Sequence, residues 1–324
     1  MIEVSKAMIK KIVFILEEPH TGITALRKRC DALSQRLIAF TSRDVRGIEN
    51  DFTLASAKNA SQIYHDLKNR NDLATTLFAT NLPALASEII DDGAYCIGLI
   101  EGNAREEDFP TARYLFAEFD EVEEDSYVKA YQRLAGEPWS ILETERTYLR
   151  ETCVEDVDAF YEIYKEPKIT QYMEGLFTDP EDEKRYTRDY IEKVYGLMGY
   201  GVWTVIDKAT NAIIGRAGLS LRGGFTDAEL GFLIAVPYQG KGYATEVITA
   251  ILAYAKNSLS FDQVQALVKD DNTESIHLLT KCGFAPAEEV SIEEGVYGND
   301  YTGERVNVLS DITFGTYLQM KKIL

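Results

Sequence analysis

Cysteine and histidine are scarce in this chain of 324 residues, which contains four of the first and three of the second. No CxxC spacing occurs and the histidines are not clustered. The sequence therefore predicts no metal site and no disulfide framework. Cysteines that form no disulfide framework are typical of a reducing compartment, and we therefore expect a cytoplasmic protein.

Long apolar runs are also missing. The run near the N-terminus, Ile12 to Leu16, ends at Glu17 and Glu18 and is too short for a secretory signal. No segment approaches the roughly 20 apolar residues that a membrane-spanning helix needs. We therefore expect no membrane insertion.

Positive charge is in deficit, because 34 Lys and Arg stand against 53 Asp and Glu, a formal net charge of −19. Phosphate backbones and anionic membrane surfaces are bound by basic side chains. We therefore expect neither a nucleic acid nor a membrane as partner, whereas a cationic substrate is compatible with this charge. The length favours two domains.

The first half alternates short apolar runs with segments that can be helical, which predicts a small parallel α/β, Rossmann-like domain over residues 1–140. The runs are typical of buried strands. They are Lys11–Leu16, Leu37–Phe40, Thr76–Thr80, Tyr95–Ile100 and Tyr114–Phe116, with helices expected over Thr21–Gln35, Ala55–Asn69 and Leu82–Asp92.

The segments Thr80-Asn81, Cys96–Leu99 and Phe109–Phe116 resemble the later half of a haloacid-dehalogenase-like domain. Such phosphatases need an Asp nucleophile after the first strand, where this chain has Leu16-Glu17-Glu18-Pro19. The resemblance implies a degenerate, non-catalytic domain. A receiver-like domain is the alternative, and it lacks its acidic cluster in the same way.

The second half, residues 141–324, predicts a mixed, mostly antiparallel sheet flanked by helices. Closely spaced strands indicate hairpins, and Asp179-Pro180 followed by acidic residues predicts the start of a helix that runs to about Leu197. The expected strands are Glu145–Arg150, Trp203–Ile206, Ile213–Leu221, Ala228–Ile234, Gln263–Val268, Gly295–Tyr301 and Ile312–Gln319, and later helices are expected over Gln239–Asn257 and Asn272–Lys281.

One segment of the second half has the pattern of a ligand-binding loop. A strand ends at Ile234, Pro237 breaks it, and Gln239-Gly240-Lys241-Gly242-Tyr243-Ala244 opens a helix. Unpaired N–H groups and the dipole at a helix start suit a phosphate, and two glycines let it approach the backbone. The segment is neither a Walker loop nor GxGxxG.

This Q-x-x-G-x-A pattern resembles the acyl-CoA pyrophosphate loop of the GNAT N-acetyltransferases. The helix Asn272–Lys281, followed by Cys282-Gly283-Phe284, and the strand Glu145–Arg150 agree with that family over about residues 141–324. The most similar branch includes the ribosomal-protein N-terminal acetyltransferases. The resemblance implies acetyl transfer from acetyl-CoA to a primary amine, either a small molecule or a protein N-terminus.

The same resemblance implies roles for individual residues. The backbone of Leu233, Ile234, Ala235 and Val236 would pair with the pantetheine arm, and the N–H groups from Gln239 to Ala244 would hold the pyrophosphate. Asn272 and Ser275 would lie near the pantetheine or the adenosine. The thioester would sit where the strand ending at Ile234 splays from Gln263–Val268.

An amine must lose a proton before it attacks a thioester, and a carboxylate can accept that proton directly or through water. Glu229 is our candidate for this base, and the alternative is an acid that only orients the acceptor. Glu174 and Trp203 are candidate acceptor contacts. Many relatives have a tyrosine as general acid where this chain has Leu279, and Tyr297 or Tyr301 is a possible substitute. An acyl-CoA-sensing module without catalysis is the alternative function.

Overall fold

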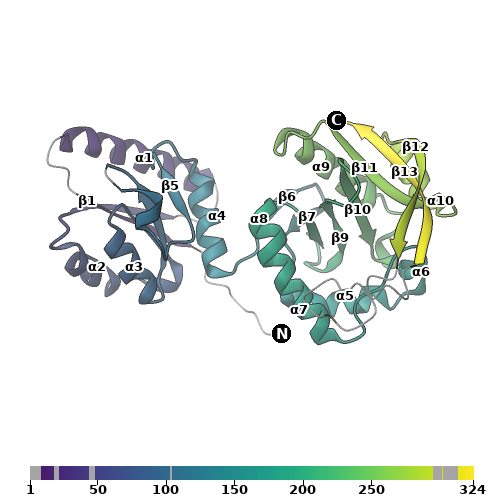
Figure 1. The fold of residues 1–324 in the computed structure, drawn as a ribbon, viewed down its shortest axis with the longest axis horizontal. Coiled ribbons are helices and arrows are strands. Elements are labelled where there is room, and N and C mark those ends of the chain that lie inside the picture. The colour runs from purple at the N-terminus through teal and green to yellow at the C-terminus, as the bar shows by residue number, and fades with distance from the viewer. Residues whose placement is uncertain (1–8, 18–21, 44–47, 103, 295–300, 302–312) are drawn as a thin grey trace. The chain divides into compact units, whose positions relative to one another are not determined.

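The computed structural model describes residues 9–17, 22–43, 48–102, 104–294, 301 and 313–324. The chain divides into two compact units, residues 1–139 and 140–324, and each is described by itself (Figure 1). No helix among the described residues is long and apolar enough to cross a membrane.

The N-terminal unit is a parallel sheet with the strand order β2-β1-β3-β4-β5, which is the winding of flavodoxin-like folds. Helices α1 and α4 pack on one face and α2 and α3 on the other, each over its own apolar cluster. The strands are β1 (Lys11–Glu17), β2 (Glu49–Ala55), β3 (Thr76–Thr80), β4 (Tyr95–Ile100) and β5 (Leu115–Ala117), and the helices are α1 (Ile23–Arg43), α2 (Ala60–Lys68), α3 (Pro83–Asp91) and α4 (Glu124–Ala135).

The strand predicted over Leu37–Phe40 is wrong, because these residues belong to α1. Cys30, Leu33 and Leu37 are buried at helical spacing, while Ile38 is exposed. The edge strand next to β1 is β2, in which the polar residues Asn50 and Asp51 interrupt any apolar run. An edge strand needs no such run, since only part of it is buried.

The C-terminal unit is built on a sheet with the order β12-β13-β11-β10-β9-β8-β7-β6, in which only β10 and β11 are parallel neighbours. Its strands are β6 (Ser140–Glu143), β7 (Thr147–Arg150), β8 (Val202–Asp207), β9 (Ile213–Ser220), β10 (Ala228–Ile234), β11 (Gln263–Lys269), β12 (Ala285–Glu294) and β13 (Thr313–Ile323). The predicted mixed, mostly antiparallel architecture is confirmed.

Helices cover both faces of this sheet. Helices α9 (Tyr243–Asn257) and α10 (Thr273–Lys281) pack over the main apolar core, and α5 (Val157–Tyr164) and α6 (Pro167–Thr170) pack on the opposite face. Helix α7 (Pro180–Tyr190) begins at the N-cap Asp179 and continues through a π-helical turn (Ile191–Tyr195) into α8 (Gly196–Met198). The predicted strand over 312–319 coincides with β13 from Thr313 onward, whereas 295–300 and 312 fall outside the described residues. The strand β12 was not expected.

A buried ion pair fastens the first strands to the start of α5. Arg150 donates to both carboxylate oxygens of Asp156 at 2.7 and 2.6 Å, and the Thr204 hydroxyl donates to the same group. Burial works to raise the pKa of Asp156, but the hydrogen bonds and charge of Arg150 hold it below the usual value. This carboxylate therefore stabilises the folded unit in its ionised form.

We expect Asp156→Ala to lower the free energy of unfolding by about 3–5 kcal/mol at pH 7, since Arg150 loses its partner. An unfolded Asp titrates near pH ~3.9, and the folded pKa lies lower. The difference between wild type and variant is then complete above about pH 5 and fades as the pH falls through the folded pKa. Urea unfolding at several pH values measures it. The control is Asp158→Ala, whose side chain is 81% exposed, and an equal loss in both variants contradicts the prediction.

Candidate acyl-CoA and acceptor site

The parallel neighbours β10 and β11 diverge almost as soon as they pair. Their register includes only Ala228 opposite Val264 and Glu229 opposite Gln265, although both strands continue for five further residues or so. The edge of β10 that faces β11 therefore has no strand partner from Leu230 to Ile234 among the described residues. Such an edge can accept an extended ligand as an added strand.

The loop that leaves β10 presents a run of backbone donors. Gly240 and Gly242 adopt φ values of +70° and +86°, and Gly242 is the N-cap of α9. Within the described part of the chain, the N–H groups from Gly240 to Thr245 donate to no protein acceptor. A Cβ at Gly240 would meet nothing within 4 Å, so the loop is open on that side. Free N–H groups at a helix start form an anion site.

Contacts from behind hold this loop in place. The Arg146 guanidinium donates to the Lys241 carbonyl at 2.9 Å and to Glu246 of α9, and it lies 4.2 Å from the centre of the Tyr243 ring. The Tyr243 hydroxyl donates to Asp207 at 2.9 Å. These contacts occupy the loop carbonyl and leave its N–H groups outward. Sequence reasoning missed Arg146, because its partners are about 100 residues away in the chain.

Two other predicted cofactor positions have clear structural roles. The Gln239 amide donates to the Ile234 carbonyl at 2.8 Å, which fixes the loop to the end of β10. The Asn272 side chain accepts from the Ser275 N–H at 3.1 Å and so caps α10. Leu233 and Ala235 are buried against α5 and α6, with Val236 packed beside them. The structure thus brings Leu233–Val236 and the loop together at one end of β10.

The comparisons with known proteins bear on the same region. The family model described as an acetyltransferase (GNAT) domain matches residues 146–285. An uncharacterized N-acetyltransferase, p20 of Bacillus licheniformis, is 32% identical over 148 residues, which are 44% of this chain and 81% of that relative. The uncharacterized protein YkkB of Bacillus subtilis is 33% identical over 150 residues, 44% of this chain and 83% of that one. The crystal structure of a GNAT-family acetyltransferase from Bacillus anthracis is similar with a TM-score of 0.43 and 21% identity, covering 56% of this chain and 97% of that one.

The chain belongs to the GNAT acetyltransferase family. The matches cover the C-terminal unit, so the membership concerns this part of the chain. The family uses acetyl-CoA, and the residues described above fit such a ligand: an unpaired strand edge for an extended arm and a loop of free N–H groups for a pyrophosphate. The described residues contain no group of three or more side chains that could hold a metal ion.

Glu229 lies on the opposite face from α9, in the GNAT unit, next to the point where β10 and β11 diverge. Its side chain is 12% exposed, and Arg222 across the β9–β10 turn donates to its two oxygens at 2.5 and 3.2 Å. This pairing fixes the orientation of the carboxylate. Sequence reasoning missed Arg222, although its place seven residues before Glu229 across a hairpin was a usable signal.

Residues on the same face of β10 as Glu229 leave open space. Side chains alternate along a strand, so Glu229, Gly231 and Leu233 share a face. A Cβ added at Gly231 would meet nothing within 4 Å. Arg216 of β9 lies directly opposite Leu233 in the register and so belongs to this face. We refer to the face defined by Glu229, Gly231, Leu233 and Arg216 as the acceptor face.

An aromatic cluster from α7 and the segment before it stands beside the acceptor face. The ring of Tyr186 packs tilted against Phe177 and against Tyr190, with ring centres 5.7 and 6.0 Å apart. The buried Glu183 accepts from the Phe177 N–H at 3.2 Å. Burial raises the pKa of Glu183, and the charge of Arg216 opposes that shift.

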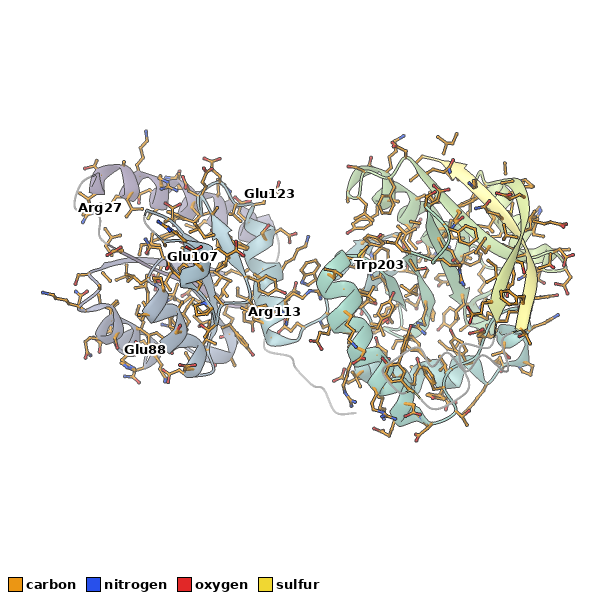
Figure 2. All side chains as sticks on the ribbon, viewed as in Figure 1. Arg27, Glu88, Glu107, Arg113, Glu123 and Trp203 are labelled. Atoms are coloured by element: carbon orange, nitrogen blue, oxygen red, sulfur yellow. The ribbon has the colours of Figure 1, made fainter. Side chains whose placement is uncertain are left out.

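The remaining candidates lie in different places. Trp203, labelled in Figure 2, is fully buried and packs its ring 5.5 Å from Tyr254 of α9, on the face away from Glu229. We therefore leave Trp203 out of the acceptor site. Glu174 is half-buried, and its charge contributes to the raised pKa of Tyr317 on β13, after burial and Glu294. It stays a candidate.

The positions considered for a general acid also differ. Leu279 is fully buried in the core under α10. The Tyr301 hydroxyl donates to Asp189 at 2.7 Å, and burial and this carboxylate raise the pKa of Tyr301 to about 12. Tyr297 lies outside the described residues.

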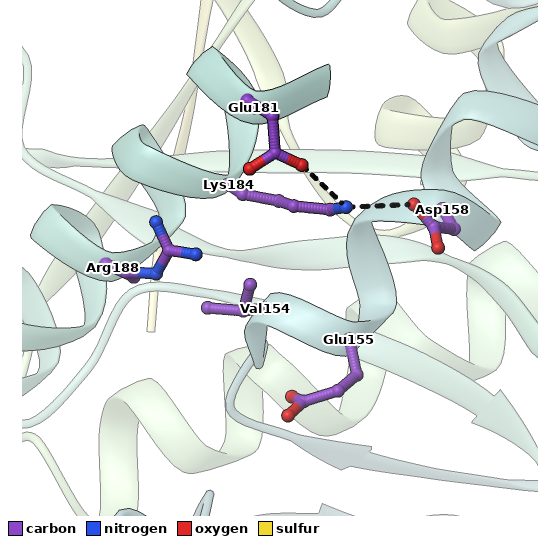
Figure 3. Close-up of a pocket in the computed structure, with 6 residues that line it drawn as sticks. All are labelled: Val154, Glu155, Asp158, Glu181, Lys184 and Arg188. Atoms are coloured by element: carbon purple, nitrogen blue, oxygen red, sulfur yellow. Dashed lines mark hydrogen bonds and ion pairs between the residues drawn. The ribbon is translucent and has the colours of Figure 1, made fainter. Parts of the chain in front are cut away.

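A hollow of about 450 Å³ opens between α7 and the start of α5 with the turn before it (Figure 3). Lys184 lies between Glu181 and Asp158 there, at 3.1 and 3.7 Å, with Arg188 beside them. These ion pairs are exposed and therefore weak. The hollow is separate from Glu229 and the loop, and we assign it no part in the chemistry.

Proposed function

We propose that residues 140–324 transfer an acetyl group from acetyl-CoA to a primary amine that is bound at the same time. The observation that supports this best is the divergence of β10 from β11 between a loop of free N–H groups and Glu229. An extended thioester bound along β10 would bring its reactive carbon to the acceptor face.

The proposed chemistry follows from this arrangement. The amine nitrogen attacks the thioester carbon, the C–N bond forms, and the C–S bond breaks to release CoA. Glu229 accepts the proton that the amine loses, directly or through one water. The leaving thiolate takes up a proton from water, which is feasible because a thiol has a pKa of about 8.5. Backbone N–H groups of β10 would stabilise the oxyanion.

For the N-terminal unit we propose a non-catalytic, receiver-like role. Its winding is flavodoxin-like, and Asn81 follows β3 and Glu17 ends β1 at the carboxyl edge of the sheet, with no aspartate at these positions. The Glu17 N–H donates to the Asn81 side chain at 2.7 Å, which links the end of β1 to the residue after β3.

An acceptor screen tests the proposed function. Purified full-length protein is incubated with acetyl-CoA and a panel of amines that includes amino acids, polyamines and peptides, and free thiol is measured. We expect release of CoA that depends on an amine, with a product that gains one acetyl group by mass spectrometry. Tight CoA binding without turnover of any amine overturns the proposal and favours the acyl-CoA-sensing alternative.

A further inference from the structure

Arg216 is the least expected group on the acceptor face. It lies in the middle of β9, opposite Leu233 on one side and Thr204 on the other. Its guanidinium lies 4.6 Å from the centre of the Phe160 ring of α5, and its positive charge works to lower the pKa of Glu183 on α7. The side chain therefore lies between the sheet and the helices that flank the acceptor face.

This guanidinium makes no hydrogen bond or ion pair with the described residues, and its buried Nε donates to no acceptor. The buried carboxylate of Glu183 acts on its charge, but no carboxylate of the described residues lies within the 4.0 Å of an ion pair. Arginine stays charged in proteins, and a buried charge without a partner is costly. Other arginines of this unit each form an ion pair. Arg150 pairs with Asp156, Arg222 with Glu229 and Arg146 with Glu246.

The surroundings suit an anion that comes with a ligand. Gly231, two residues from Leu233 on the same face, leaves open space beside Arg216. Besides its own burial, the groups that act on the pKa of Arg216 are Tyr164, Tyr195, Glu183 and Tyr186, and Glu183 is the one carboxylate among them. A guanidinium presents its donors in a fork that matches a carboxylate.

The separation from Glu229 limits the size of such a ligand. Glu229 and Leu233 are four residues apart on β10, which is about 13 Å between Cα atoms in an extended strand. Arg216 lies opposite Leu233 in the register, so a similar interval separates its backbone from that of Glu229. An acceptor that touches Arg216 with an anion and Glu229 with its amine must therefore be small.

We propose that the acceptor is a small primary amine that carries a carboxylate, as amino acids do, and that Arg216 binds this carboxylate. The inference rests on the proposed transferase function. Arg216 then determines the specificity for the acceptor, and Glu229 lies at the amine of the acceptor. A polyamine or an uncharged amine leaves the guanidinium unpaired.

Matched acceptor pairs test the inference. Each amino acid is compared with the amine that lacks its carboxylate: lysine with cadaverine, phenylalanine with phenethylamine, tyrosine with tyramine. We expect wild-type kcat/KM to favour the carboxylate-bearing member of at least one pair by about 10-fold or more, as for a charge-assisted hydrogen bond. Arg216→Met should reduce that ratio to about one through KM, and Arg216→Lys should restore part of it.

The control is Arg188→Met, which removes an exposed arginine of α7 that lines the separate hollow rather than the acceptor face and should leave the ratio as in wild type. A wild-type ratio at or below one in every pair overturns the proposal, as does a preference that survives Arg216→Met. Calorimetric titration of the same amino acids into the CoA-bound protein separates two failures. Binding that is lost in Arg216→Met without any turnover refutes the transferase but retains the carboxylate site, whereas turnover of amines without a carboxylate preference refutes only the site.

Discussion

Gly242→Glu is expected to raise the Kd and KM for acetyl-CoA by about 100-fold or more, which corresponds to about 2.7 kcal/mol. Gly242 has φ +86° at the N-cap of α9, where a side chain is strained. A glutamate there also places a negative charge among the N–H groups that the pyrophosphate needs, and juxtaposed like charges cost several kcal/mol. Calorimetric titration of acetyl-CoA measures the change.

Two variants separate charge from backbone strain. Gly93→Glu introduces the same residue at φ +77°, after α3 of the N-terminal unit, where a Cβ meets nothing within 4 Å. It should leave acetyl-CoA affinity as in wild type. Gly242→Ala keeps the strain without the charge, with its Cβ 3.4 Å from Arg146, and should have an intermediate effect. An unchanged Kd in Gly242→Glu shows that the loop does not hold the phosphates.

Strands that are buried on both faces were predicted with accurate bounds. Thr76–Thr80 and Tyr95–Ile100 are β3 and β4, because a short unbroken apolar run is typical of a parallel strand that is buried on both faces. The same rule failed at Leu37–Phe40, where a helix packs on a sheet and buries a short apolar run equally well. Length alone did not separate the two cases, since the run is the last part of a longer amphipathic pattern.

The loop of the candidate site could be located from sequence because its chemistry is local. Glycines, a helix start and a preceding strand end all lie within a few residues of Gln239. Groups that act across the fold could not be found in this way. Arg146 reaches the loop from about 100 residues away, and Arg216 is notable only because the structure shows that it forms no ion pair with the described residues. Trp203 illustrates the converse, since a large aromatic in a central strand was as compatible with the core as with a ligand.

Glu229→Gln is expected to lower kcat by about 100-fold at pH 7, the low end of what a positioned general base contributes. Glutamine keeps the size of the side chain and can still accept from Arg222, so the fold should be retained. The loss should diminish at high pH, because a larger fraction of the acceptor is then already neutral; α-amines titrate near ~7.7–8.0 and lysine near ~10.4. A pH profile of kcat with the acceptor found in the screen measures both effects.

The matched control for this prediction is Glu181→Gln, which removes an exposed carboxylate paired with Lys184 on α7 and should leave kcat as in wild type. The variants Arg222→Gln and Glu229→Gln together distinguish a general base from an acid that only orients the acceptor. If Glu229 accepts the proton, freeing it from Arg222 disorders the base and lowers kcat. If Glu229 only holds the acceptor ammonium, Glu229→Gln raises KM and leaves kcat unchanged across the pH range, and the role of base must then be assigned elsewhere on the acceptor face.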